Sequence, residues 1–261
     1  MLSALIALVE SKRRPPATEV VFAGLVDEED AQAGSRALAA SGLCADLAVV
    51  GEPTGLKVVT AHKGDLWLEI ETRGRAAHGS RPDLGKSAIV AMATVVRALE
   101  GDYAADLRRR RHGLLGSPTV NVGTILGGVQ PNIVPDRCQI RVDRRTIPGE
   151  TEAGVRREIR RMLRRVGATA RVAKLPHGPC PPLETDHRQP MVQLLLRAAD
   201  QTGPVGADYF CDAAILATGG IPSVVFGPGN IAQAHTADEW ISLRQVDGAT
   251  ARLRRFLESL P

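Results

Sequence analysis

The chain has 261 residues, of which 44% are hydrophobic, and its 33 lysines and arginines against 29 aspartates and glutamates give a formal net charge of +4. This composition supplies enough apolar surface for a folded core and excludes a wholly disordered chain. No run of about 18 apolar residues is present, so no transmembrane helix is expected, and the N-terminal sequence is not typical of a secretory signal. At about 150 residues per domain, the length predicts one large domain or two smaller ones.

The positive charge is concentrated in arginine clusters. Aromatic residues make up only 3% of the chain, whereas nucleic-acid-binding proteins combine basic patches with a recognition motif or with exposed stacking aromatics. We therefore interpret the clusters as solvated faces and expect no nucleic acid and no membrane as a partner. The clusters comprise Arg108 to Arg111, together with Arg156, Arg157, Arg160, Arg161, Arg164 and Arg165.

The four cysteines are far apart, and no two of them form a CxxC pair. This spacing argues against a zinc ribbon and against a thioredoxin-type redox site. We expect buried, reduced thiols in a cytoplasmic protein. The cysteines are Cys44, Cys138, Cys180 and Cys211.

The first fifty residues predict an α/β layer. Apolar residues at helical spacing predict a helix over residues 1–12, and the nearly continuous apolar run EVVFAGLV at 19–26 predicts a strand buried on both faces. A short helix to about Ala40 and a second buried strand, LAVV at 47–50, follow. Strand, helix and strand at this spacing are typical of a largely parallel sheet.

The pattern changes after Lys63. Residues 65–72, DLWLEIET, alternate strictly, with leucine and isoleucine on one side and Glu69 and Glu71 on the other, which predicts a strand with one solvated face. The order of the predicted elements is then β-α-β-β-α-β, which is the split arrangement of ferredoxin-like domains. The later elements are a helix at 86–99, strands at 119–126 and 136–145, a helix at 150–166 and a strand at 168–174.

The last third of the chain returns to buried strands and helices. Helices are predicted at 190–201, 211–217 and 243–260, and a buried strand, SVVF, at 223–226. The predicted fold class is therefore α/β, a split domain with a mostly parallel sheet and helices on both faces, interrupted by an α+β domain. The predicted ranges are 1–61 and 176–261 for the split domain and 62–175 for the inserted one.

Chemically suitable side chains follow the predicted strands, where sites lie in open α/β sheets. The acidic run at 27–29 offers a general base and a metal ligand, although acids in a first helical turn also stabilise the helix dipole. Glu52, after LAVV, is either a hard oxygen ligand or a solvated strand end. His235 and His78 are candidates for a ligand and a catalytic group, but a lone loop histidine is usually just exposed.

Together these segments resemble a known family, the dinuclear zinc amidohydrolases and exopeptidases. It includes acetylornithine deacetylase, succinyl-diaminopimelate desuccinylase, aminoacylase and glutamate carboxypeptidase, and the context of His235 looks closest to the first of these. The resemblance implies a catalytic α/β domain, a ferredoxin-like lid through which two subunits form a homodimer, and an N-acyl amino acid or small peptide as substrate. The motifs that match in order and spacing are GLVDEE, VVGEPTG, HKG, AAHGSRPDLGKSAI, GGVQPNIVPDR, VDRRTIPGE, GIPSVVFGPG and AHTADEW.

The same resemblance implies a role for individual residues. Glu28 is similar to the general base that deprotonates a metal-bound water, and His78 to the lid histidine that stabilises the oxyanion in the other subunit's site. Glu29 and His235 are similar to ligands of one zinc, and Glu52 to a ligand of the other, with cobalt or manganese as alternative metals. The residues that are similar to the family's substrate-binding groups are Asn132, Arg145, Gly227, Pro228 and Gly229.

Two features of the family are missing from the sequence. Members carry a His-x-Asp motif and a bridging aspartate ahead of the acidic run, but here no histidine precedes His62 and no aspartate precedes Asp27. We therefore expect an N-terminally truncated member with impaired hydrolysis and with no ion, or with one ion shared by Glu29, Glu52 and His235. The alternatives are an inactive fragment and a dimer that binds amino-acid-type ligands without hydrolysing them.

Overall fold

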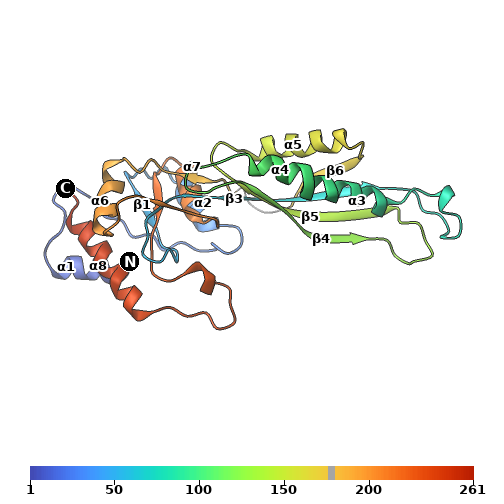
Figure 1. Cartoon of the computed structure of the whole chain (residues 1–261). Coiled ribbons are helices and arrows are strands. Elements are labelled where there is room, and N and C mark those ends of the chain that lie inside the picture. Colours follow the sequence, from blue (N-terminus) through green and yellow to red (C-terminus); the bar gives the residue numbers. More distant parts are fainter. Residues whose placement is uncertain (176–179) are drawn as a thin grey trace. The chain divides into compact units, whose positions relative to one another are not determined.

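The structure, a computed structural model, describes residues 1–175 and 180–261 and divides the chain into two compact units (Figure 1). The split unit comprises Met1–His62 and Leu183–Pro261, and the inserted unit comprises Lys63–Pro182. An α/β unit interrupted by an α+β unit is what the sequence predicts, and this fold class is confirmed. Within the described residues, no helix is long and apolar enough to cross a membrane.

The split unit is built on a five-stranded sheet of mixed pairing. Its elements are α1 (Leu2–Glu10), α2 (Ala33–Ala40), β1 (Ala48–Val50), β2 (Val59–His62), β7 (Leu183–Glu184), α6 (Pro190–Ala198), β8 (Val205–Ala207), α7 (Asp212–Thr218), β9 (Ser223–Val225), the 3-10 turn Ile231–Gln233 and α8 (Leu243–Glu258). β1 lies parallel to β9 and β2 parallel to β8, whereas β2 is antiparallel to β7 and β9. The sheet therefore contains more antiparallel pairing than the apolar runs predict.

The segment at 19–26 is not the buried strand that its composition predicts. It has no regular structure, and Val21, Phe22 and Val26 are exposed to 61%, 52% and 69%. A strand forms only where a neighbour accepts and donates its backbone hydrogen bonds. Among the described residues β1 pairs with β9 alone, so this apolar run has no adjacent strand to join and its prediction is wrong.

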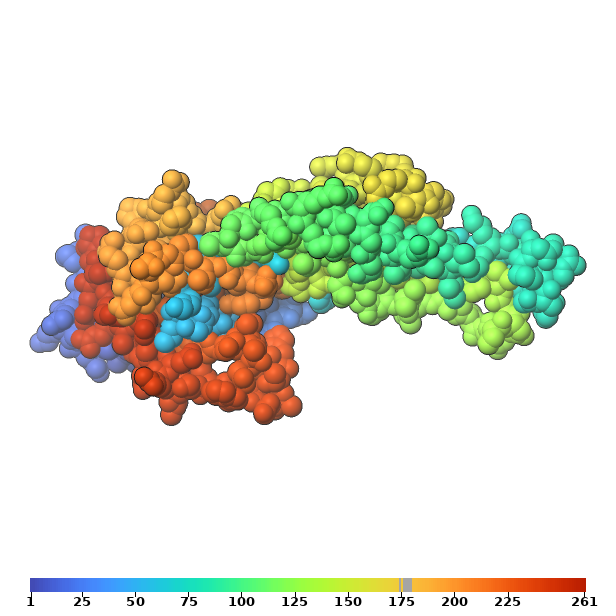
Figure 2. All heavy atoms as spheres, viewed as in Figure 1, coloured from blue at the N-terminus to red at the C-terminus, as the bar shows by residue number. Residues whose placement is uncertain are grey.

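The inserted unit is a four-stranded antiparallel sheet in the order β4-β5-β3-β6. This is the ferredoxin-like order, and α3, α5 and the sheet share one apolar core in which Ile70, Met92, Ile140 and Ile159 are fully buried. In Figure 2 the helices of this unit, coloured green and yellow, are visible at its surface above the light-green strands. Its elements are β3 (Gly64–Arg73), the 3-10 turn Pro82–Leu84, α3 (Ala88–Ala98), a π-helical turn (Leu99–Tyr103), α4 (Ala104–Arg108), β4 (Thr119–Gly127), β5 (Arg137–Thr146), α5 (Glu152–Arg165) and β6 (Ala170–Lys174).

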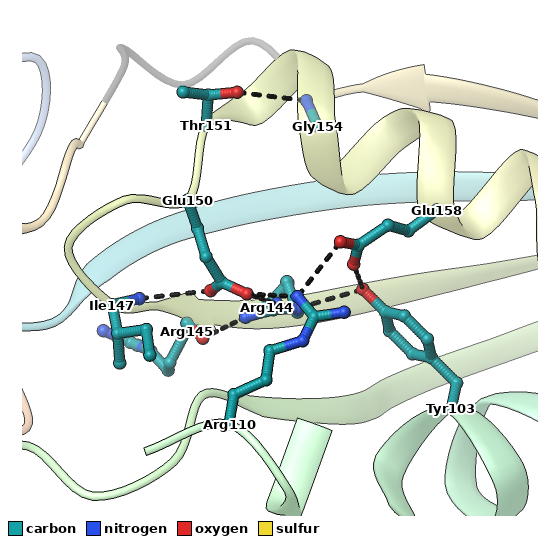
Figure 3. A network of polar contacts seen from close by, with 9 residues as sticks. All are labelled: Tyr103, Arg110, Arg144, Arg145, Ile147, Glu150, Thr151, Gly154 and Glu158. Carbon is teal, nitrogen blue, oxygen red and sulfur yellow. Dashed lines mark hydrogen bonds and ion pairs between the residues drawn. The ribbon is translucent and has the colours of Figure 1, made fainter. Parts of the chain in front are cut away.

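A buried polar network joins β5 to the helices of the inserted unit (Figure 3). The Arg144 side chain is fully buried; its guanidinium donates to Glu150 Oε1 (2.7 Å), to Tyr103 Oη (3.1 Å) and to the Arg145 carbonyl. Arg110 pairs with both Glu150 and Glu158. Since a buried guanidinium without an anion is costly, these carboxylates are needed to keep Arg144 inside the unit.

Two side chains of the described structure depart from the sequence prediction. Glu71 is only 5% exposed although it lies on the predicted solvated face of β3, because Arg73 and Arg137 cover it at 2.6 and 2.7 Å. These contacts, led by the hydrogen bond from Arg73, hold the pKa of Glu71 below its usual value. Cys44 is exposed because the turn after α2 lies at the surface, whereas the other three cysteines are buried as expected.

Candidate functional site

In the acidic run at 27–29, Asp27 stabilises the start of α2, whereas Glu28 and Glu29 make no such contact. Asp27 takes the left-handed backbone conformation (φ 67°), and its Oδ2 accepts a hydrogen bond from the amide of Ala33, the first residue of α2 (3.2 Å). The helix-capping alternative thus applies to Asp27. Glu28 is half-buried and Glu29 is exposed, and neither makes this capping contact.

Glu29 and His235 meet although 206 positions separate them in the sequence. His235 Nε2 lies 3.3 Å from Glu29 Oε2, and both side chains are largely exposed. The backbone of His235 is also left-handed (φ 62°), and its amide donates to Glu239 Oε2 (3.0 Å), which orients the loop. An imidazole and a carboxylate at this distance are two donors suited to one zinc ion.

Glu52 follows β1 and is held against the loop after β9. Gly227 must be a glycine here, because a Cβ at this position would lie 2.6 Å from the Glu52 carbonyl oxygen. The loop is tied down further by the residues that follow Glu52: the amide of Gly55 donates to the Gly229 carbonyl (2.7 Å), and the amide of Leu56 donates to the Gly227 carbonyl (3.0 Å). Backbone contacts thus hold Glu52 and the predicted substrate loop together.

Negative charge accumulates at these carboxylates. Burial, together with the charges of Glu28, Asp212 and Glu29, raises the pKa of Glu52 to about 7. The pKa of Glu28 is also raised, first by burial and then by Glu29 and Asp212, while His235 opposes the shift. A bound cation would stabilise the charged form of carboxylates that lie close together and are partly buried.

Asp212 is a part of this acidic group that sequence reasoning missed. It is the first residue of α7, is 5% exposed, and accepts a hydrogen bond from the hydroxyl of the fully buried Ser35 (2.7 Å). This contact links α7 to α2, the helix that follows the acidic run. The only sequence signal was an aspartate that opens a short helix, which is more often a dipole-stabilising residue than part of a site.

A cavity of about 520 Å³ lies beside Glu52 in the split unit. Its wall is formed in part by Phe226, Gly227, Trp240 and Leu253, so it is mainly apolar, and Glu52 and Glu239 add two carboxylates to the lining. A pocket of this kind has the size and lining of a small-molecule site. The predicted substrate loop, Gly227 to Gly229, forms part of the same wall.

The inserted unit brings two of its three predicted site residues together. The amide of Gly79, next to His78, donates to the Asn132 carbonyl (2.7 Å), and His78 forms an isolated bridge with Ile133. His78 is exposed, and its Nδ1 is 2.8 Å from Ser80 Oγ, which leaves Nε2 for another partner. Arg145 lies near the other end of β5 and so is separated from this pair.

Arg145 is held by two acids of its own unit. It forms two hydrogen bonds of 3.0 Å with Asp143 and lies 3.7 Å from Asp65 Oδ1. Asp65 is 4% exposed. Burial and the neighbouring Asp143, opposed by Arg145, together raise the pKa of Asp65 to about 6.

We expect the Asp65→Asn variant to be more stable than the wild type above pH 6 and equally stable near pH 4. A folded-state pKa that is raised above the unfolded value of 3.8 gives stability at low pH that is lost as the pH rises through about 6. The shift corresponds to roughly 2–3 kcal/mol. Urea unfolding followed by Trp67 fluorescence in a Trp240→Phe background measures it, with the exposed Asp83→Asn as control. A variant with the pH slope of the wild type would contradict the assignment.

We expect the Gly227→Ala variant to lose about 1–3 kcal/mol of unfolding free energy, because the added methyl forces the Glu52 backbone to move. Gly203→Ala is the matched control in the same unit, because its added methyl meets no atom within 4 Å. Urea unfolding with Trp240 as the probe compares the two variants. Equal unfolding free energies of the two variants would show that the loop at Gly227 accommodates the methyl group without loss of stability.

The comparisons with known proteins cover both units. Residues 60–170 match the family model of the peptidase dimerisation domain. The acetylornithine deacetylase of Edwardsiella ictaluri is 34% identical over 224 residues, which are 83% of this chain and 57% of that protein. The acetylornithine deacetylase of Myxococcus xanthus is 33% identical, over 88% of this chain and 62% of that protein.

The chain is a member of the M20 amidohydrolase and exopeptidase family. It spans about three fifths of the length of the curated relatives it matches. Among solved structures, the aminopeptidase PepT from Bacillus cereus shares the fold with a TM-score of 0.76 and 24% identity, over 98% of this chain and 67% of that one. A dinuclear metal-binding M20 peptidase from Bacillus subtilis superposes with a TM-score of 0.66 at 17% identity, over 98% of this chain and 69% of that one.

The described residues offer fewer donors than a catalytic zinc ion requires. Glu29 and His235 supply two donors, whereas catalytic zinc sites use three protein ligands. Within residues 1–175 and 180–261, no group of three histidine, cysteine, aspartate or glutamate side chains is placed to hold an ion. The described residues therefore do not fit a complete catalytic zinc site in this arrangement.

Proposed function

We propose that this chain belongs to a metal-dependent hydrolase that cleaves the amide bond of N-acyl amino acids or small peptides, as acetylornithine deacetylases do. The observation that carries the proposal is the 3.3 Å contact between Glu29 and His235 beside the carboxylates of Glu28 and Glu52. The relatives named acetylornithine deacetylase support the reaction class. We further propose that hydrolysis by this chain alone is impaired, because Glu29, Glu52 and His235 would have to rearrange to hold one ion.

The chain's own residues would share the work of the reaction. Glu28 is half-buried with a raised pKa, which suits a carboxylate that takes a proton from the attacking water. His78 would donate a hydrogen bond from Nε2 to the developing oxyanion in the site of a second subunit. The groups proposed to hold the substrate are Asn132, Arg145, Gly227 and Gly229.

A homodimer through the inserted unit is part of the proposal. β4 is an edge strand whose Ile125 is 55% exposed, and α3 exposes the apolar side chains of Ile89 and Val90 to 39% and 68%. We call these three residues the β4 edge patch. An unpaired strand edge with apolar neighbours is suited to pairing with a second copy, and the match to a dimerisation domain supports this use. We also propose a cytoplasmic location, in keeping with four free cysteines.

Metal stoichiometry after dialysis against trace zinc, together with hydrolysis of N-acetyl and N-succinyl amino acids, tests the proposal. We expect up to one ion per chain that is lost in His235→Ala. Glu28→Ala is expected to keep the ion and to lose turnover by about a hundredfold or more, since it removes only the base. An active Glu28→Ala variant would remove Glu28 from this role.

The incomplete donor set favours a second candidate function, a dimer that binds an amino-acid-type ligand without hydrolysis. This alternative predicts no bound zinc, no hydrolysis, and ligand affinity that a chelator leaves unchanged. Calorimetric titration with N-acetyl amino acids, with and without chelator, separates the two functions. A chain that binds neither zinc nor ligand would contradict both of them.

A further inference from the structure

Charge is segregated between the two units of this chain. The inserted unit has 22 lysines and arginines against 12 aspartates and glutamates, a formal charge of +10, whereas the split unit has 11 against 17, a formal charge of −6. The net charge of +4 conceals this division. A domain with this excess of positive charge attracts polyanions.

Much of the excess lies on α5. The helix is anchored by its capping residue, since Thr151 Oγ1 accepts from the Gly154 amide (3.1 Å), and its large apolar residues are buried in the core. Its outer side is visible at the surface in Figure 2. Four exposed arginines with helical spacing form what we call the α5 arginine face, made up of Arg157, Arg160, Arg161 and Arg164.

The acids near this face are already occupied by other cations. Glu152 pairs with Arg156 (3.4 Å) and Asp102 with Arg165 (3.6 Å), while Glu158 binds Arg110 and Tyr103. None of the four arginines of the face forms an ion pair with a carboxylate of the described residues. The contact of Arg110 with Glu158 also brings the basic run at 108–111 beside the first half of α5.

The residues around the α5 arginine face indicate which kind of polyanion it can bind. The apolar residues of α5, such as Val155 and Ile159, are buried in the core, so the helix has no apolar side to insert into a membrane surface. Of the tyrosine and tryptophan residues of the inserted unit, Tyr103 is buried and Trp67 lies on β3, so bases of a single strand find no stacking platform on α5. Guanidinium groups bind phosphates well, and Arg157 to Arg164 span about 10 Å, the length of three phosphates on one strand of a duplex.

We propose that the α5 arginine face binds the phosphate backbone of duplex DNA without sequence preference. This inference is independent of the hydrolase proposal and reverses the expectation, drawn from the sequence, of a merely solvated face. The sequence showed only that arginines cluster; the structure shows that four of them share one exposed face and that the nearby acids serve other partners.

Fluorescence anisotropy with a labelled 24-base-pair duplex tests the proposal on the full chain. We expect binding at 50 mM salt that weakens by about 40- to 150-fold at 200 mM, as three to four phosphate contacts require. R157Q/R160Q/R164Q is expected to weaken binding at least about tenfold at 50 mM and to flatten the salt dependence. K12Q/R13Q/R14Q removes the same charge from exposed positions of the split unit and is expected to change the affinity less than about twofold.

A charge-retaining variant separates lost contacts from a disturbed helix. R157K/R160K/R164K is expected to bind within about threefold of the wild type, because lysine also neutralises phosphates. The proposal is overturned if the lysine variant loses as much as the glutamine variant, or if both glutamine variants weaken binding equally. It is also overturned if the chain does not bind the duplex at 50 mM salt, or binds single-stranded DNA or anionic vesicles more tightly.

Discussion

Glu150→Gln is expected to destabilise the inserted unit by about 3–5 kcal/mol, the cost of removing one partner from a buried ion pair. Glu150 is 11% exposed and Arg144 is fully buried, with 2.7 Å between Oε1 and the guanidinium. In the variant, the Arg144 charge stays inside the unit without its carboxylate, and Arg110 loses the same partner (Figure 3). Urea unfolding followed by Trp67 in the Trp240→Phe background reads this unit alone.

Glu152→Gln is the matched control, two residues away. Its side chain is 34% exposed and pairs with Arg156 at 3.4 Å on the helix surface, so we expect a loss of at most about 0.5 kcal/mol. A double variant, Arg144→Met with Glu150→Leu, removes both charges and is expected to recover much of the stability. If Glu150→Gln lost no more than the control, Arg144 would not depend on Glu150.

Val90→Glu with Ile125→Glu is expected to raise the dissociation constant of the proposed homodimer by at least about 30-fold. Both residues belong to the β4 edge patch, and two carboxylates there would be buried opposite their copies in the other subunit. Truncation or charging of central apolar residues typically costs about 2 kcal/mol or more at an interface. Sedimentation velocity over a range of protein concentrations measures the change.

Leu2→Glu with Ile6→Glu is the control for this prediction. It places the same two charges on exposed apolar residues of α1 in the split unit, where we propose no interface. The control is expected to dimerise like the wild type. A wild-type chain that is monomeric at micromolar concentration, or a patch variant that dimerises normally, would contradict a dimer through β4.

The local sequence pattern was sufficient to predict those helices and strands whose conformation is determined by their own residues. α5 was predictable because Thr151 caps it and apolar residues recur at helical spacing, and β3 because its residues alternate. The inserted unit consists of such elements joined in chain order, and its fold was therefore predictable. β7 and β8, of two and three residues, were not, because such short strands exist only through their partner β2.

The candidate site was predictable as a set of residue types but not as a geometry. Motif resemblance singled out Glu28, Glu29, Glu52 and His235, and the structure brings Glu29 and His235 to 3.3 Å. Asp212 was missed because its partner Ser35 lies 177 positions away, and no local pattern reports a contact of that range. Arg145 is predicted to bind a substrate carboxylate, but Asp143 and Asp65 already contact its guanidinium. Only the fold brings these two acids beside it.

The sequence by itself determined the α/β class and the inserted ferredoxin-like unit, since composition, periodicity and spacing are local properties. Only the tertiary structure decided which charges are paired. It buries Arg144 against Glu150, covers Glu71 with two arginines, and pairs the α5 arginine face with no carboxylate of residues 1–175 and 180–261. The exposed apolar run at 19–26 makes the same point, because a strand is completed by its neighbour and not by its own sequence.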